Sequence, residues 1–243
     1  MKIIYIFYFL FLLPIFLVAQ EDEKNEKTIA IYGIATIQMP EFSNFNTILQ
    51  ANNYSTLPAL KTNLGGGIMF RRGDISTQLE LRSYKNDITN KISNGTLNVS
   101  LFQLNIGYSF LSTDKFKITP MLGAGVARGN LSIFPISNPN NTLGGLLTAP
   151  TGFAQLNTTQ FSLHLGLQAD AFPIYFNITG GKKVRTLVAL KTGYYLPFQE
   201  VTWRTGNTSM FGTGGNPVSD KINMNFGGFY VSLIAGIEFL RIR

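Results

Sequence analysis

The stretch LFQLNIGYSF, residues Leu101 to Phe110, decides the fold of this chain. Every second residue carries a large apolar side chain, and the residues between them are polar or small. The apolar set is Phe102, Leu104, Ile106, Tyr108 and Phe110; the other set is Gln103, Asn105, Gly107 and Ser109. A period of two is that of a β-strand with one apolar face, and about ten residues let a tilted strand cross a bilayer. The stretch therefore predicts a membrane-spanning strand.

The same alternation recurs along the chain after residue 28 and defines eight candidate strands. They cover residues 29–38, 61–71, 74–83, 98–110, 115–126, 158–171, 184–196 and 225–240. The first is the weakest, because Ile29, Ile31, Ile34 and Ile37 do not keep one parity. In the last, Phe229 and alternate residues to Phe239 form an unbroken apolar face.

The connections between these segments alternate in length. Three are short, at 71–74, 111–115 and 172–183, and four are long, at 39–60, 84–97, 127–157 and 197–224. Short turns on one rim and long loops on the other are typical of bacterial outer-membrane barrels. We therefore expect an all-β fold over residues 29–243, a transmembrane antiparallel up-and-down β-barrel of about eight strands. Ten strands are the alternative, because Leu131 to Ile136 or part of 197–224 can form another hairpin.

The N-terminus predicts export. Lys2 precedes the apolar run from Ile3 to Val18, and Ala19 offers a small residue for cleavage. We expect residues 1–20 to be a cleaved signal peptide and residues 21–28 to be a charged N-terminal segment. The alternative is an uncleaved N-terminal membrane helix, although this run is short for a span.

Composition narrows the class of protein. Only 14% of the residues are charged, whereas an average soluble domain has about 25%. There is no cysteine, which excludes disulfides, thiolate metal sites and lipid attachment at an N-terminal cysteine. The expected location is the cell outer membrane, with its lipid and the barrel-insertion machinery as partners.

The net charge of +7 is concentrated on the rim of the short turns and on the tail. Basic side chains at a membrane edge reach anionic headgroups. A nucleic-acid binder needs a continuous basic face with stacking aromatics instead, so we expect no nucleic-acid partner.

Parity places charged side chains inside the predicted barrel. An eight-stranded barrel is filled by its own side chains, and buried charges must be matched. We therefore expect an ion-pair network that plugs the lumen, with Asp170 near Arg185, Glu238 one strand further, and Lys191 reaching Glu80 and Arg82. The full set is Glu80, Arg82, Lys117, Asp170, Arg185, Lys191 and Glu238. The alternative is a narrow, gated ion path through the same residues.

The sequence offers little chemistry. His164 is the single histidine and shares the inward face with Ser162, with Glu80 or Asp170 as an acidic third member, but no nucleophile motif surrounds Ser162. One histidine without cysteines or clustered carboxylates is a poor metal site. We expect no catalytic residues, no metal and no cofactor, hence no enzyme.

Several short stretches resemble the small outer-membrane β-barrel family of Bacteroidota, an outer membrane protein beta-barrel domain of OmpA-type architecture. They are Leu17-Val18-Ala19-Gln20, residues 170–174, the basic pair Lys182-Lys183, residues 190–198, and the glycine-rich segments 64–67 and 121–125. The resemblance implies a barrel in the outer membrane and says little about activity. In such barrels a terminal aromatic residue is read by the insertion machinery, whereas this chain ends in Arg243, which leaves that role to Phe239.

Three functions follow from these observations. The first is a non-enzymatic, structural protein of the cell envelope whose long surface loops bind an extracellular glycan or protein ligand. Their aromatic residues, which would serve either binding or packing of the loops against one another, are Phe42, Phe45, Tyr54, Phe134, Phe153, Phe198, Trp203 and Phe211. The second is a small pore or gated channel. The third is a soluble secreted β-barrel with its apolar face inward around an apolar ligand.

Overall fold

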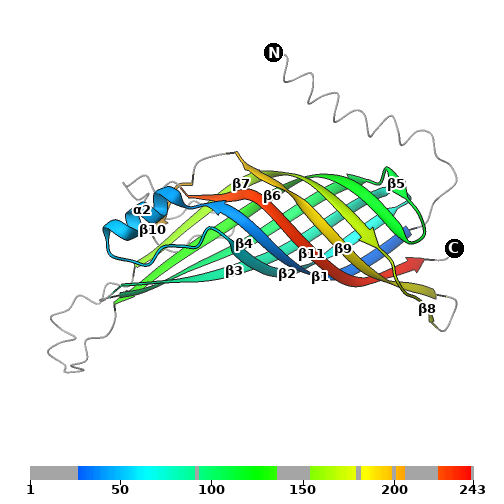
Figure 1. Cartoon of the computed structure of the whole chain (residues 1–243), viewed down its shortest axis with the longest axis horizontal. Helices are drawn as coiled ribbons and strands as arrows, with labels where there is room; N and C mark the ends of the chain where they lie inside the picture. The colour runs from blue at the N-terminus through cyan, green and yellow to red at the C-terminus, as the bar shows by residue number, and fades with distance from the viewer. Residues whose placement is uncertain are drawn as a thin grey trace, which may run out of the picture.

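The computed structural model describes residues 27–90, 93–135, 154–178, 182–198, 201–205 and 224–241. Eight long strands form a barrel whose axis is horizontal in Figure 1. These strands are β1 (Lys27–Glu41), β2 (Lys61–Arg72), β3 (Ile75–Thr89), β4 (Ser93–Tyr108), β6 (Phe116–Pro135), β7 (Ala154–Ala171), β9 (Lys182–Pro197) and β11 (Asn225–Arg241). The elements between them are α2 (Ser43–Ala51), β5 (Leu111–Ser112), β8 (Tyr175–Ile178) and β10 (Arg204–Thr205).

The eight strands close on themselves. Each pairs antiparallel with the next long strand along the chain, and β1 pairs with β11 to complete the ring. The stagger of the strands can be followed from Leu81 through the paired residues of successive strands around the ring. Through β2, β1 and β11 the pairing leads to Val188, and through β4, β6 and β7 it leads to Phe198. These two residues are ten positions apart, so the shear number of the barrel is ten. Such a stagger accompanies strands that tilt relative to the barrel axis. The predicted eight-stranded antiparallel up-and-down barrel is confirmed, and the ten-stranded alternative is wrong among the described residues.

The predicted faces are also confirmed. Phe102, Leu104 and Ile106 point outward and are exposed, whereas Gln103 and Asn105 point into the lumen and are buried. The first strand keeps a strict alternation as well, with Ile34 on the inner face. An outer surface of exposed Ile, Leu and Phe contradicts the soluble barrel with apolar residues inside, because water would then contact a continuous apolar belt.

Parts of two predicted long loops, 84–97 and 127–157, are strand instead. Residues 84–97 mostly extend the β3–β4 hairpin, which stays paired as far as Thr89 and Asn94. Residues 131–135 continue β6 and pair with β4 rather than forming a hairpin of their own. Segment 39–60 contains α2, which was not expected. The polar outer faces of these extensions resemble loops in composition, and this resemblance explains the errors.

Glycine is required at two backbone positions. Gly73, with φ 59°, makes the tight turn between β2 and β3. Gly228, with φ 115°, lies beside an irregularity in the β1–β11 ladder, where the pairing shifts between Met39 and Glu41. A Cβ atom at Gly228 would lie 2.0 Å from the carbonyl oxygen of Met39. A non-glycine residue would be strained at this bend.

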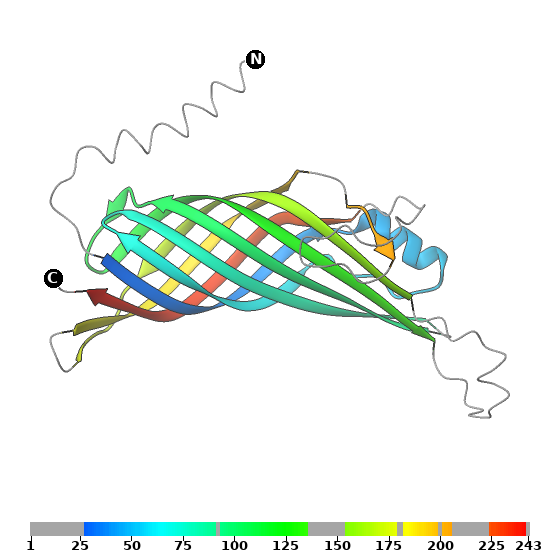
Figure 2. The same cartoon turned by 180° about the vertical axis from the view of Figure 1, so that it is seen from behind.

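The two ends of the barrel differ (Figures 1 and 2). The start of β1, the end of β11 and the short turns lie at one end, and α2 lies at the other. No helix in the described ranges is long and apolar enough to cross a membrane. The expected signal peptide, residues 1–20, lies outside these ranges.

Candidate functional site

The amphipathic sense of strand β4 reverses along its length. From Phe102 to Tyr108 the outward residues are apolar and the lumen-facing residues are polar or glycine. From Asn94 to Leu101 the outward residues are polar, whereas the inward ones include Leu97, Val99 and Leu101. Parity is unbroken, so the side chains keep their faces and only their chemistry changes. The two halves of one strand are therefore suited to different surroundings.

The reversal lies in register on the neighbouring strands. Leu81, Phe102, Val126 and Phe161 form the last apolar row on the outer surface. The next row toward α2 consists of Ser83, Ser100, Arg128 and Thr159. Further along, Lys85 and Thr96 donate to the exposed Asp87, at 3.2 and 3.1 Å, and lower its pKa. The outer surface thus divides into an apolar belt and a polar extension.

At the short-turn end, the lumen is closed by a cluster of charged side chains. Arg185 Nε donates to Glu238 Oε2 at 2.6 Å, and Arg71 Nη1 donates to Glu238 Oε1 at 3.0 Å. The second terminal nitrogen of Arg71 donates to Asp170, and Thr28 donates to Glu238. These side chains are buried, and both arginines lie over the ring of Phe172. We name this set, Thr28, Arg71, Asp170, Phe172, Arg185 and Glu238, the mouth cluster.

The mouth cluster differs from the sequence-based expectation at one partner. The expected neighbour of Asp170 was Arg185, but Arg71 occupies that place and bridges Asp170 to Glu238. The sequence-based prediction put Arg71 at the end of strand 61–71, where the turn 71–74 begins, and did not include it in the lumen network. Arg71 has the same parity as the lumen-facing Asn63 and Met69, so the alternation along this strand already indicated that its side chain points inward. The pairing of Arg71 with Asp170 depends on which strands face each other across the lumen. The alternation within single strands does not specify this arrangement.

A second charged group fills the lumen further from the mouth. Lys191 Nζ donates to Glu80 Oε1 at 2.7 Å, and Arg82 Nη2 lies 3.9 Å from Glu80 Oε2. Tyr32 also donates to Glu80, at 3.1 Å, from a position where the lumen-facing Gly67 leaves room for its ring. Arg82 donates to Gln103 and Tyr195. The structure thus brings together the three residues expected at mid-barrel.

His164 belongs to this packing. Its Nδ1 lies 2.6 Å from the Asn105 amide oxygen, and its Nε2 contacts the Tyr230 hydroxyl. The rings of Tyr195 and Tyr230 stack with centroids 4.7 Å apart, and Arg82 lies over both rings. Both ring nitrogens of His164 are thereby engaged with residues other than Ser162. The geometry does not assemble a nucleophile with its base, and the described residues contain no group of three metal-binding side chains.

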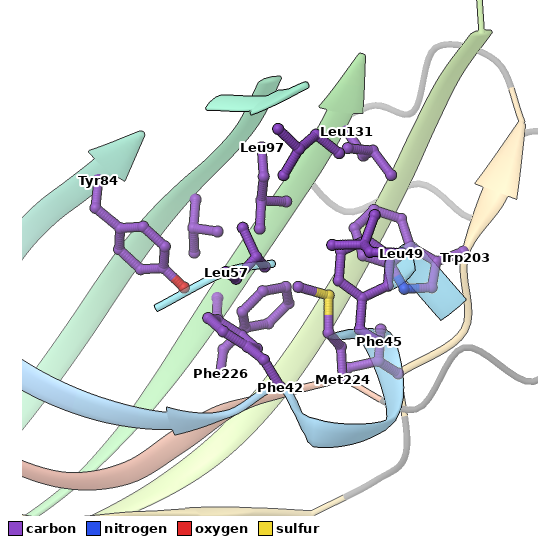
Figure 3. Close-up of a cluster of buried hydrophobic side chains, with 14 of the residues drawn as sticks. Phe42, Phe45, Leu49, Leu57, Tyr84, Leu97, Leu131, Trp203, Met224 and Phe226 are labelled. Atoms are coloured by element: carbon purple, nitrogen blue, oxygen red, sulfur yellow. The ribbon is translucent and has the colours of Figure 1, made fainter. Parts of the chain in front are cut away.

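At the other end, a hydrophobic core fills the polar extension (Figure 3). Strands β3, β4 and β6 line it with their inward residues, and α2 packs into it with Phe45 and Leu49. Trp203, just before β10, stacks on Phe45 with ring centroids 6.3 Å apart. We name this core the cap; its buried members are Phe42, Phe45, Leu49, Leu57, Tyr84, Ile88, Leu97, Val99, Leu101, Ala127, Leu131, Val201, Trp203, Met224 and Phe226.

Local sequence explains how α2 sits in the cap. Phe45 and Leu49 are four residues apart and share one helix face, with the half-buried Ile48 beside them. Asn53, with φ 60°, turns the chain after the helix, and the Asn46 side chain bonds both polar backbone atoms of Leu57. The predicted loop aromatics could serve ligand binding or packing. Phe42, Phe45 and Trp203 are buried in the cap, so these three serve packing. Phe134 and Phe198 are exposed, and Phe153 and Phe211 lie outside the described residues.

These features define the class of protein. It is a closed eight-stranded antiparallel β-barrel with an apolar outer belt, a lumen filled by ion pairs and a hydrophobic cap. No protein-family model matches the sequence, and no curated protein matches it.

Solved structures resemble the fold at low identity. Ail, the attachment invasion locus protein of Yersinia pestis, is 7% identical, with 90% of this chain and 99% of Ail covered and a TM-score of 0.43. A major outer membrane protein from Thermus thermophilus is 12% identical, with coverages of 87% and 99% and a TM-score of 0.44. Neisserial surface protein A is 12% identical, with coverages of 87% and 95% and a TM-score of 0.34.

Proposed function

We propose that the chain is a non-enzymatic, non-conducting integral barrel of an outer membrane, of the small type found in Bacteroidota, which presents its cap on the cell surface. The observation that supports this most directly is the reversal of amphipathic sense on β3, β4 and β6. A strand in hydrocarbon needs an apolar outer face, and a strand in water needs the opposite. The belt is thus the part in lipid, and the capped extension stands in water beyond it.

The lumen supports a structural role over the alternative pore. Ions crossing the barrel would have to pass the mouth cluster, the Glu80–Lys191 pair and the cap in succession. Removing charges from their partners in a dry interior costs several kcal/mol, about 3–5 for one broken pair. Binding of an extracellular glycan or protein ligand by the long surface loops is the second part of this proposal.

Two measurements test the proposal. The first is SDS-PAGE of outer-membrane fractions from expressing Gram-negative cells, boiled and unboiled. A band in that fraction that shifts on heating is the expected result. The second is conductance of planar bilayers after insertion of the purified protein. No single-channel steps are expected above the empty bilayer. Steady conductance would instead support the pore hypothesis. A soluble protein in the periplasm or medium would contradict the proposed location in the membrane.

A further inference from the structure

A cavity of about 90 Å³ opens at the short-turn end of the barrel, and Thr28, Arg71 and Arg185 of the mouth cluster form part of its wall. Three cationic side chains line it: Arg71 from β2, Lys117 from β6 and Arg185 from β9. Ser112 and Thr113 also belong to its wall, although the Thr113 hydroxyl already donates to the carbonyl oxygen of Phe116, at 3.0 Å. Strands and turns far apart in the sequence therefore place several hydrogen-bond donors around one small space.

Lys117 is the cation of this cavity that the mouth cluster does not neutralise. Asp170 and Glu238 are held by Arg71 and Arg185, whereas no acidic oxygen of the described residues lies within 4.0 Å of Lys117. Among the described residues, the Lys117 ammonium donates a hydrogen bond only to the carbonyl oxygen of Gly73, at 3.5 Å, although Lys117 is half-buried. A half-buried ammonium group with one long contact is poorly satisfied.

Arg71 lines the same cavity as Lys117, and one N–H group of its guanidinium donates no hydrogen bond to the described residues. Both of its terminal nitrogens are engaged with Asp170 and Glu238, but its buried Nε has no partner among the described residues. The residue is 5% exposed, so bulk water does not readily supply one. Because this Nε is closed to solvent, an oxyanion in the cavity would interact with the positive charge of the Arg71 guanidinium, which lines the cavity.

Two acids also line the cavity and oppose an anion. Asp74 is half-buried in the β2–β3 turn, and Asp114 is exposed in the turn before β6. They are outnumbered, because the strand ends and turns at this end carry nine cations and four acids in the described ranges. The cations are Lys27, Arg71, Arg72, Lys115, Lys117, Lys182, Lys183, Arg185 and Arg241; the acids are Asp74, Asp114, Asp170 and Glu238. The surplus positive charge raises the local concentration of anions.

We propose that this cavity binds a phosphate group, with Lys117 as its principal donor and Arg71 and Arg185 beside it. Two sources supply that chemistry: the headgroup of a phospholipid in the adjacent leaflet, or a free phosphate. The headgroup source rests on the proposed membrane location, whereas the site itself does not. In either case the ligand would satisfy Lys117 and seal the mouth of the lumen.

The test uses the refolded protein in a maltoside detergent, which contains no phosphate. Inorganic phosphate is titrated at constant ionic strength against chloride, by calorimetry and by the temperature at which the folded gel band disappears. Phosphate is expected to bind and to raise that temperature, because a ligand of the folded state stabilises it. Lys117→Gln should weaken binding about tenfold or more. Lys183→Gln, which removes an exposed charge at the same end, should bind like the parent.

The proposal is overturned if the parent protein shows no response beyond that to chloride, or if Lys117→Gln binds as tightly as the parent. The source is decided by adding phosphatidylglycerol or a phosphate-free galactosyl diacylglycerol. If phosphatidylglycerol alone abolishes the response to inorganic phosphate, the ligand is a headgroup; if neither lipid does, it is free phosphate. Calorimetry in detergent does not depend on cellular location, so failure of the membrane assignment would be recognised separately by fractionation.

Discussion

The belt and the capped extension of the barrel are built from the same strands with opposite rules. In the belt, Phe102 and Leu104 face outward while Gln103 is buried in a polar lumen. In the extension, Asn98 faces outward while Leu97 is buried in the cap. Backbone pairing and parity continue across the change. The face of a strand that carries apolar residues therefore indicates what surrounds it. The residue at which the apolar face changes marks the boundary between two environments.

The two regions also hold together by different forces. Inside the belt, ion pairs and hydrogen bonds among buried polar groups lie beside a smaller apolar cluster that includes Ile34, Met69 and Ile234. Loss of one charged partner there leaves an unmatched charge. Burial of apolar side chains holds the cap, so loss of one side chain leaves a cavity. Mutations that suit one region should damage the other, and the predictions below are ordered from the largest expected effect to the smallest.

The largest effect is expected in the lumen of the belt. Glu238→Gln removes the acid that holds both Arg71 and Arg185, and should lower the free energy of unfolding by about 3–5 kcal/mol. Urea unfolding in detergent, followed by tryptophan fluorescence and the gel shift, measures it. Glu41→Gln, at the exposed end of β1, is the control and should change stability by no more than about 0.5 kcal/mol. Equal effects would show that the mouth cluster contributes nothing.

The cap should respond to loss of volume, and locally. Phe45→Ala removes a ring that is 2% exposed and stacked on Trp203, at a cost of about 3–5 kcal/mol to the docking of α2. Limited proteolysis should then cut within α2, while the heat-shifted band of the barrel persists. Gln50→Ala, on the exposed face of the same helix, should leave α2 protected. A loss of the barrel band in Phe45→Ala would mean that the two regions are not separate.

A charge on the outer surface compares the two regions on a single strand. Ile106→Arg places a cation in the middle of the belt and should cost about 2–4 kcal/mol, the range for arginine facing lipid near the bilayer midplane. Asn98→Arg places the same residue on the extension of the same strand and should stay within about 0.5 kcal/mol. Folding into lipid vesicles at graded urea concentrations measures both. Equal costs at the two positions would contradict the boundary between them.

The smallest effect concerns the bend that leads β11 into the cap. Gly228→Ala forces a side chain into a backbone with φ 115° and should cost about 1–3 kcal/mol. Gly33→Ala provides the matched control, because the nearest atom to its new Cβ would be 3.9 Å away. Urea unfolding of the two variants should separate them, and equal stability would remove the strain argument.

Sequence alone predicted the belt well, because a period of two is a local property that each strand carries by itself. It missed the extension because only one sense of amphipathicity was expected: with Tyr84, Ile88 and Leu97 inside and polar residues outside, segment 84–97 resembled a loop. The contact between Arg71 and Asp170 depends on the shear of the closed barrel, and single strands do not specify the shear. The cap joins α2, Trp203 and Phe226 from distant parts of the chain, and this long-range packing could not be predicted.

The most direct test of the account is a cysteine scan along the outer face of β4. The chain has no cysteine, so each variant carries a single environment-sensitive fluorophore at residue 94, 96, 98, 100, 102, 104 or 106. In lipid vesicles, with quenchers in water and in the acyl chains, we predict aqueous quenching at 94–100 and lipid quenching at 102–106. Aqueous quenching at every position, or lipid quenching at 94–98, would contradict the assignment of belt and extension.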